Sequence, residues 1–230
     1  MNLIITIMLL FIVLLVLVKV YDINTRKLKQ FVEYEETKFN KLVEKYPSNI
    51  EICKSILKKL NNKDVKIEED KNSKTCLYIV QTNKIVIADV KNSYTRIQTL
   101  AHECLHSVQN RKILLFNFIY SNIYLLYFFL CTILAVFNKI KNGMLYVSIM
   151  LILSYIYYFV RSYLENDAMI KAKYLAKDYM SEKNITEKEE IDNIIESYEK
   201  LNNIGIKTVN YQLMFETIIK VIILVIAFLI

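Results

Sequence analysis

Four apolar runs, at residues 3–18, 113–137, 144–160 and 217–230, alternate with polar segments along this chain of 230 residues. A helix needs about 20 predominantly apolar residues to cross the hydrocarbon core of a bilayer. The first three runs approach or exceed that length, whereas the last is short and is interrupted by Lys220. The pattern predicts an α-helical membrane protein with about four transmembrane helices.

These runs divide the chain into five segments. We expect transmembrane helix 1 at 1–20, a membrane-proximal region at 21–112, a transmembrane hairpin of helices 2 and 3 at 113–160, a second polar segment at 161–215 and transmembrane helix 4 at 216–230. The first run has neither a basic segment before it nor small residues before Lys19, so an uncleaved anchor is favoured over a signal peptide. The two polar segments together contain the residues available for a folded domain.

The polar segments predict a small, mostly helical domain with a short β-hairpin. Apolar residues spaced three and four apart predict two amphipathic helices within 21–60, interrupted at Pro47. Two β-rich runs, 76–80 and 84–88, are separated by a short polar turn and predict the hairpin. A further amphipathic pattern predicts a helix over 93–109, with a serine as its N-cap.

Composition and charge narrow the class of protein. The chain is 54% hydrophobic and 23% charged with only 2 Gly and 1 Pro, which excludes a disordered or collagen-like chain and a disulfide miniprotein. Lysines and arginines that flank membrane spans explain most of the formal charge of +7, so we expect no nucleic-acid partner. The four cysteines show no CxxC spacing, which fits a reducing compartment.

The candidate chemistry is concentrated in a His-Glu-x-x-His sequence at 102–106. Residues four apart share one face of a helix, so His102 and His106 can bind one zinc ion. Glu103 lies beside them and can act as the general base toward a zinc-activated water. Random placement would put two histidines four positions apart on the order of one time in a hundred. The alternative interpretation is that these are polar residues on a solvated helix face.

Zinc bound by two imidazoles needs a third protein ligand if one position is to stay open for water. The chain has no third histidine, and Cys104 points away from the metal on the motif helix. Glu165 is the best carboxylate, because a membrane hairpin returns it to the side of the membrane on which His106 lies. Asp167 is the second choice, and its expected role is to accept a hydrogen bond from a ligand imidazole. The competing roles for Glu165 are a helix-dipole acid and an ion pair with Arg161.

The segment that follows the hairpin, residues 161–200, is charged and predicts a helical region. Ala168, Ala172 and Ala176 recur at four-residue steps near the face that carries Glu165. Small side chains on one face let two helices approach closely. We therefore expect this helix to pack against the motif helix.

These residues resemble a known family. The motif at 102–106 followed by Gln109, with a Glu-Asn-Asp-Ala element at 165–168 after a membrane hairpin, looks like the YugP-type membrane zinc metallopeptidases of bacteria, which are distantly similar to HtpX-like gluzincins. The likeness covers about 84–176 and implies a zincin-like domain, zinc-dependent peptidase activity and the glutamate of the second element as third ligand. Leu105 stands where the family motif has glycine, which bears on helix packing more than on metal binding.

The sequence as a whole predicts a membrane-embedded peptidase with one Zn²⁺ per chain, whose partners are the lipid bilayer and a protein or peptide substrate. A strand of the hairpin could offer its edge to an extended substrate, and the excess of flanking basic residues places the site on the cytoplasmic side. Four residues are candidates for the group that donates a hydrogen bond to the oxyanion, and the sequence favours none of them: Tyr94, Arg96, Arg161 and Tyr163. The alternatives are a catalytically silent metal-binding scaffold and a basic, metal-free lipid-binding anchor.

Overall fold

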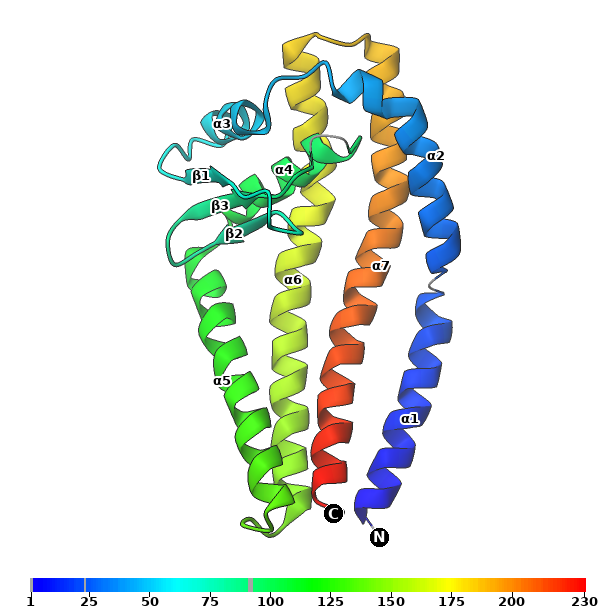
Figure 1. The fold of residues 1–230 in the computed structure, drawn as a ribbon, viewed down its shortest axis with the longest axis vertical. Coiled ribbons are helices and arrows are strands. Elements are labelled where there is room, and N and C mark those ends of the chain that lie inside the picture. The colour runs from blue at the N-terminus through cyan, green and yellow to red at the C-terminus, as the bar shows by residue number, and fades with distance from the viewer. Residues whose placement is uncertain (1, 23, 91–92) are drawn as a thin grey trace. The chain divides into compact units, whose positions relative to one another are not determined.

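The computed structural model describes residues 2–22, 24–90 and 93–230 (Figure 1). Its helices are α1 (Asn2–Tyr21), α2 (Thr25–Val43), α3 (Asn49–Lys59), α4 (Arg96–His106), α5 (Arg111–Val136), α6 (Gly143–Lys183) and α7 (Lys188–Ala227), and its strands are β1 (Lys66–Glu69), β2 (Leu77–Ile79) and β3 (Lys84–Ile87). The chain divides into two compact units. The first comprises 1–23, 115–163 and 207–230, and the second comprises 24–114 and 164–206.

The first unit is built from long apolar helices. In the described part of the chain, four helical stretches are long and apolar enough to cross a membrane, as the sequence predicts: Leu3–Val43, which begins with α1, and the helices α5, α6 and α7. The last apolar run is short on its own because it is the end of the long helix α7 rather than a separate element.

Tyrosines within the apolar helices face other helices. Tyr124 is 2% exposed, stacks on Tyr157 with 5.1 Å between ring centroids, and its hydroxyl lies 3.1 Å from the hydroxyl of Ser154. The Tyr127 hydroxyl donates to the carbonyl oxygen of Tyr146 at 3.0 Å. These contacts join α5 to α6 and give the buried phenol groups hydrogen-bond partners, which an apolar environment demands.

A three-stranded sheet in the second unit contains the predicted hairpin and one strand more. β2 and β3 pair antiparallel, which confirms the hairpin. β1 adds to the other side of β3 in parallel register, so the strand order is β1-β3-β2. The hydrophobic pattern does not predict β1, because Ile67 is its one half-buried residue and the other three residues are exposed. An edge strand with so little burial lacks the alternation that identifies strands.

Local capping explains where α3 begins. Ser48 is its N-cap, and its hydroxyl accepts from the N–H of Glu51 while the Glu51 carboxylate accepts from the N–H of Ser48. This reciprocal pair satisfies two N–H groups that a helix start leaves open. The preceding Pro47 separates α3 from α2, so both predicted amphipathic helices are present, with the break where the sequence places it.

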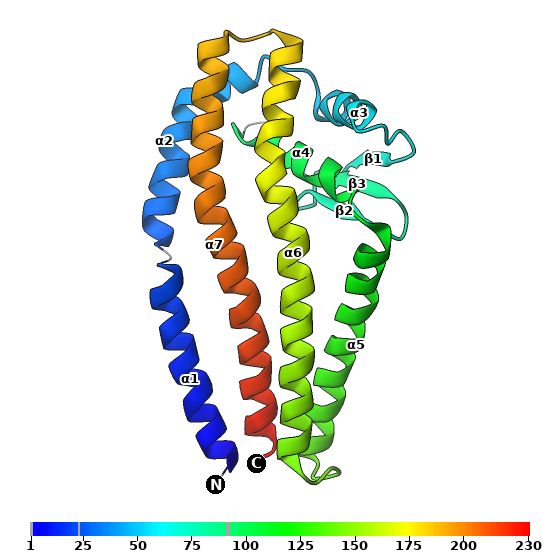
Figure 2. The same ribbon diagram turned by 180° about the vertical axis from the view of Figure 1, so that it is seen from behind.

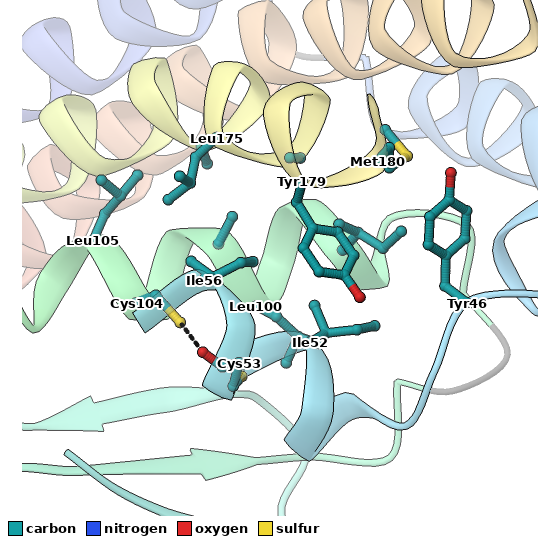
Figure 3. Close-up of a cluster of buried hydrophobic side chains, with 14 of the residues drawn as sticks. Tyr46, Ile52, Cys53, Ile56, Leu100, Cys104, Leu105, Leu175, Tyr179 and Met180 are labelled. Atoms are coloured by element: carbon teal, nitrogen blue, oxygen red, sulfur yellow. Dashed lines mark hydrogen bonds between the residues drawn. The ribbon is translucent and has the colours of Figure 1, made fainter. Parts of the chain in front are cut away.

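The core of the second unit lies where α3, α4 and α6 meet (Figure 3). Ile52, Cys53 and Ile56 of α3 are at most 1% exposed and pack toward α4, and α3 lies beside α4 in both views of the ribbon (Figures 1 and 2). The alanines of α6 are each 0% exposed within the same cluster: Ala168, Ala172 and Ala176. The Glu165 helix and the motif helix therefore contribute to one buried core.

The motif helix is shorter than predicted. α4 runs from Arg96 to His106, with Thr95 rather than Ser93 as its N-cap residue. The hydroxyl of Ser93 accepts from the N–H of Thr95 at 3.3 Å and forms a turn ahead of the helix. At the other end, Gln109 follows in a turn whose N–H groups bond back to α4 carbonyls.

A buried arginine ties α4 to the chain between α2 and α3. Arg96 is 1% exposed, and its Nη2 donates to the carbonyl oxygens of Val43 at 2.8 Å and Tyr46 at 2.7 Å. Its Nη1 donates to Oδ1 of Asn49 at 3.3 Å. One guanidinium therefore serves backbone carbonyls at and after the end of α2, where helical partners are lacking, and the side chain of Asn49 at the start of α3.

Replacing Arg96 with methionine keeps most of the apolar stem but removes the guanidinium donors from the carbonyls of Val43 and Tyr46 and from Asn49. We expect Arg96→Met to lower the free energy of unfolding of the second unit by about 3 kcal/mol. Urea-dependent proteolysis of the purified protein measures this change. The exposed control Lys71→Met should change it by less than about 0.5 kcal/mol, and an equally small effect of Arg96→Met would contradict the anchoring role.

Candidate metal centre

The two histidines of the motif meet on one face of α4. Their Nε2 atoms are 3.0 Å apart, and the rings are nearly perpendicular with centroids separated by 4.5 Å. One helical turn separates His102 from His106, which is the spacing that brings side chains of a helix together. The nitrogens that could bind a metal therefore point to one place.

Glu165 of α6 completes this cluster from a distant part of the sequence. Its Oε2 lies 3.4 Å from Nε2 of His102 and 3.7 Å from Nε2 of His106. The exposed fraction of the side chain is 19% for His102, 10% for His106 and 14% for Glu165. Among the residues that the structure describes, these three form the group whose ligand atoms all lie within 4.8 Å of one another.

The spacing of these atoms fits a small tetrahedral metal ion. Ligands at 2.0–2.1 Å around tetrahedral Zn²⁺ lie about 3.3 Å from one another, and the three observed separations are 3.0, 3.4 and 3.7 Å. Two imidazoles and one carboxylate also form the donor set of catalytic zinc sites that keep a fourth position open. The residues present therefore fit the metal that the sequence motif predicts.

Glu103 is buried beside the two histidines and is held by the sheet. It is 7% exposed, and its carboxylate accepts a hydrogen bond from the backbone N–H of Tyr78 in β2. Burial raises the pKa of Glu103, and the neighbouring His102 and His106 oppose part of that rise. A carboxylate with a raised pKa is suited to taking up and releasing a proton near neutral pH.

Gln109 fixes the orientation of the His106 ring. Its Oε1 lies 2.8 Å from Nδ1 of His106, which makes Nδ1 the donor and leaves Nε2 as the lone-pair nitrogen that faces Glu165. Burial lowers the pKa of His106, but the carboxylates of Glu165 and Glu103 and the hydrogen bond with Gln109 favour its protonated form and raise the pKa overall.

Asp167 reaches His106 through Gln109. The Gln109 Nε2 donates to Oδ2 of Asp167 at 3.0 Å and to the carbonyl oxygen of Leu164 at 2.8 Å. Asp167 also forms an ion pair with Lys171. Burial raises the pKa of Asp167, but the contacts with Lys171 and Gln109 lower it by more, so the pKa lies below its usual value. The sequence predicts a direct hydrogen bond between Asp167 and a ligand imidazole, whereas the structure inserts the Gln109 amide between them.

Cys104 lies away from the ligand cluster, as its position on the helix predicts. Its thiol donates to the carbonyl oxygen of Cys53 at 3.9 Å, as the dashed line in Figure 3 marks. Interaction with the side chain of Cys53 and burial raise the pKa of the Cys104 thiol. A thiol that stays protonated in a hydrophobic cluster is a packing group rather than a metal ligand.

Two of the four candidate oxyanion donors are occupied elsewhere. Tyr94 is 0% exposed, and its hydroxyl accepts from Ser197 at 3.4 Å within the hydrophobic core. Arg96 is 1% exposed and donates to the carbonyls described above. Neither residue is therefore available to a substrate at the candidate metal centre.

Two contacts at the centre have little or no signal in the sequence. Gln109 lies three positions after His106, a spacing that places it on the same face of a helix and that could have indicated its role. The N–H of Tyr78 is a backbone group, so no residue type at that position reveals its bond to Glu103. Only the packing of β2 on α4 brings it there.

Comparison of the chain with protein-family models, with curated proteins and with solved structures found no match. The class of site is thus defined by its geometry: two histidines and a glutamate with the spacing of metal ligands, beside a buried glutamate.

Proposed function

We propose that this protein is a membrane-anchored zinc peptidase. The observation that carries the proposal is the convergence of His102, His106 and Glu165, with the buried Glu103 next to the two histidines. Helices long and apolar enough to cross a membrane support the anchoring. The resemblance of the motif residues to YugP-type metallopeptidases agrees with this assignment.

In this proposal His102, His106 and Glu165 hold Zn²⁺. The bound ion would supply Lewis-acid chemistry, polarising a peptide carbonyl and making water more acidic. The Glu103 carboxylate takes a proton from the attacking water and delivers it to the nitrogen of the departing amine. The C–N bond of the peptide breaks, and the water oxygen remains on the new carboxyl group.

The edge of β2 is the proposed support for an extended substrate. β2 is at the end of the sheet, so one of its edges has no neighbouring strand in the part of the chain that the structure describes. The N–H of Tyr78 in the same strand donates to Glu103, which places this strand next to the proposed general base. An extended peptide that pairs with the edge would present its backbone to the reacting groups.

We infer from the flanking charges that the metal centre is on the cytoplasmic side. Basic residues are more numerous at the span ends that adjoin the polar segments than at the turn between α5 and α6. The former are Lys19, Arg26, Lys27, Lys29, Arg111, Lys112 and Arg161, and the latter are Lys139 and Lys141.

The first test separates metal binding from proton transfer. Purified protein should contain about one zinc per chain by elemental mass spectrometry, and Glu103→Gln should retain it while losing about 10²–10⁴-fold in the rate of cleavage of an unfolded protein. Glu165→Ala should lose both zinc and cleavage because a ligand is removed. The matched control is Glu189→Gln, an exposed acid, which should keep both.

Normal cleavage by Glu103→Gln would overturn the proposed base. If the unsubstituted protein and Glu103→Gln both bind zinc and neither cleaves the unfolded protein, the result would instead support the alternative of a catalytically silent, metal-binding scaffold.

Gln109 provides a second test, on the orientation of a ligand. Gln109→Leu removes the acceptor of the His106 Nδ1–H, so we expect the affinity for Zn²⁺ to fall about 10–100-fold. Competition with a chromophoric chelator measures the affinity, and the absorption spectrum of the Co²⁺ form reports the ligand geometry. Gln81→Leu makes the same substitution at an exposed turn and should change neither. Unchanged affinity and spectrum in Gln109→Leu would contradict the positioning role.

The third test concerns orientation in the membrane. Lys141→Cys, in the turn between α5 and α6, should react with a membrane-impermeant maleimide in intact cells. Lys71→Cys, in the polar segment before β2, should react only after the cells are opened. The unsubstituted protein gives the background from the native cysteines, and the reverse pattern would place the metal centre outside.

A further inference from the structure

A hollow between α3 and β1 is separate from the residues of the candidate metal centre. Its volume is about 510 Å³, within the range of pockets that hold ligands. The residues that line it are Ile50, Lys54, Leu57, Lys58, Lys63, Val65 and Ile67. All of them belong to the second unit and come from one short stretch of chain.

The floor of the hollow is apolar. Leu57 and Val65 are 3% and 8% exposed, and Ile50 and Ile67 are half-buried. Ile50 and Leu57 occupy the face of α3 next to the one that packs on α4, so α3 has a second apolar face. An apolar floor can receive the aliphatic side chains of a bound segment.

The rim of the hollow is positively charged. Lys54, Lys58 and Lys63 are exposed, and among the described residues none of them forms an ion pair. The adjacent Lys59 differs, because it pairs with Asp178 and Glu182 of α6 at 3.5 and 2.6 Å. Lys54 and Lys58 are one helical turn apart and repel each other, so an acidic ligand would relieve an unfavourable interaction that the fold itself leaves in place.

The open edge of β1 borders this hollow. Among the described residues β1 pairs with β3 only, and the N–H of Lys66 points toward β3, where it bonds to the carbonyl of Asn83 at 3.0 Å. Backbone groups alternate in direction along a strand, so the N–H groups of Ile67 and Glu69 point away from β3. An unpaired edge of this kind is a template for a further strand.

We propose that the hollow and the β1 edge form a docking site for an extended, acidic segment of a polypeptide. The segment pairs with β1 as a fourth strand, places apolar side chains on the floor and directs carboxylates to the three rim lysines. This site lies at the opposite end of the sheet from β2. Binding at this site requires no metal, and the proposal does not depend on whether the chain cleaves peptides.

Two observations favour a polypeptide over an anionic lipid. The strand edge offers directional N–H and C=O groups, which an acyl chain cannot use. The lysines also extend along the hollow from α3 to the residues before β1, so they match several charges in a row rather than one headgroup. A different role for the rim lysines is to keep β1 from pairing with strands of other chains. In that case the hollow would bind no peptide.

The probe is a short, end-capped fluorescent peptide with alternating valine and threonine at its centre and glutamates on both sides. Its binding to the full chain in nanodiscs of neutral phosphatidylcholine is followed by fluorescence anisotropy, with Glu103→Gln used so that cleavage does not intervene. We expect saturable binding that weakens as salt is raised. A peptide with lysines in place of the glutamates, and one with proline at its centre, should bind at least about tenfold more weakly.

Charge-matched variants locate the site. Lys54→Glu/Lys58→Glu should weaken binding at least about tenfold, whereas Lys71→Glu/Lys74→Glu, which changes the net charge equally at exposed positions outside the hollow, should change it less than about twofold. Circular dichroism and urea-dependent proteolysis of each variant verify that the chain is folded.

Glu69→Pro tests the strand pairing separately. Proline at this position removes an N–H that points away from β3 and leaves the ladder to β3 intact. It also removes a negative charge, which by itself would strengthen the binding of an acidic peptide, so a loss of binding identifies the backbone contact.

Three outcomes would overturn the proposal: no saturable binding of the acidic peptide, equal losses in the two double variants, or displacement of the peptide by vesicles that contain phosphatidylglycerol but not by neutral ones. The last would assign the hollow to a lipid headgroup. Because the assay uses the Glu103→Gln chain and needs no zinc, its result is independent of the peptidase assignment.

Discussion

The close packing of α6 on α4 is the contact on which the candidate metal centre depends. Glu165 is 59 residues beyond His106 in the sequence, yet its carboxylate lies 3.7 Å from the imidazole. Ala168 and Ala172 are fully buried in the core that α6 shares with α4, and their small side chains leave room for the neighbouring helix. A metal site tolerates displacements of only about 0.5 Å, and a larger side chain at either alanine would exceed that.

Buried polar groups hold the two helices in register. Gln109 bonds to His106 on one side and to Asp167 and the Leu164 carbonyl on the other, so it joins the end of α4 to α6 at the level of the ligands. At its start, α4 is tied instead to the chain between α2 and α3, because Arg96 donates to the carbonyls of Val43 and Tyr46. Each of these groups would be costly to bury without partners, and the requirement for partners makes one arrangement of the helices much more favourable than others.

The small sheet links the two proposed sites by its two edges. β2 contacts the buried Glu103 through the Tyr78 N–H, and β1 borders the lysine-rimmed hollow. The sheet has one central strand, β3, and within residues 2–22, 24–90 and 93–230 both outer strands keep an unpaired edge. Such edges can pair with strands of other chains. In this protein the edge strand β2 lies next to Glu103, and the edge strand β1 lies next to the three rim lysines.

Local signals in the amino-acid sequence were enough to predict the apolar runs, the amphipathic helices on either side of Pro47, the β2–β3 hairpin, and the one-turn spacing of His102 and His106. The sequence also identified Glu165, through the connectivity of the hairpin. Tertiary structure decided the start of α4 at Arg96, the strand β1, the insertion of Gln109 between Asp167 and His106, and the backbone bond to Glu103. The physical reason is the range of the interactions: periodicity and capping act within a few residues, whereas edge pairing and hydrogen bonds between elements depend on side chains and backbone groups that meet only after packing.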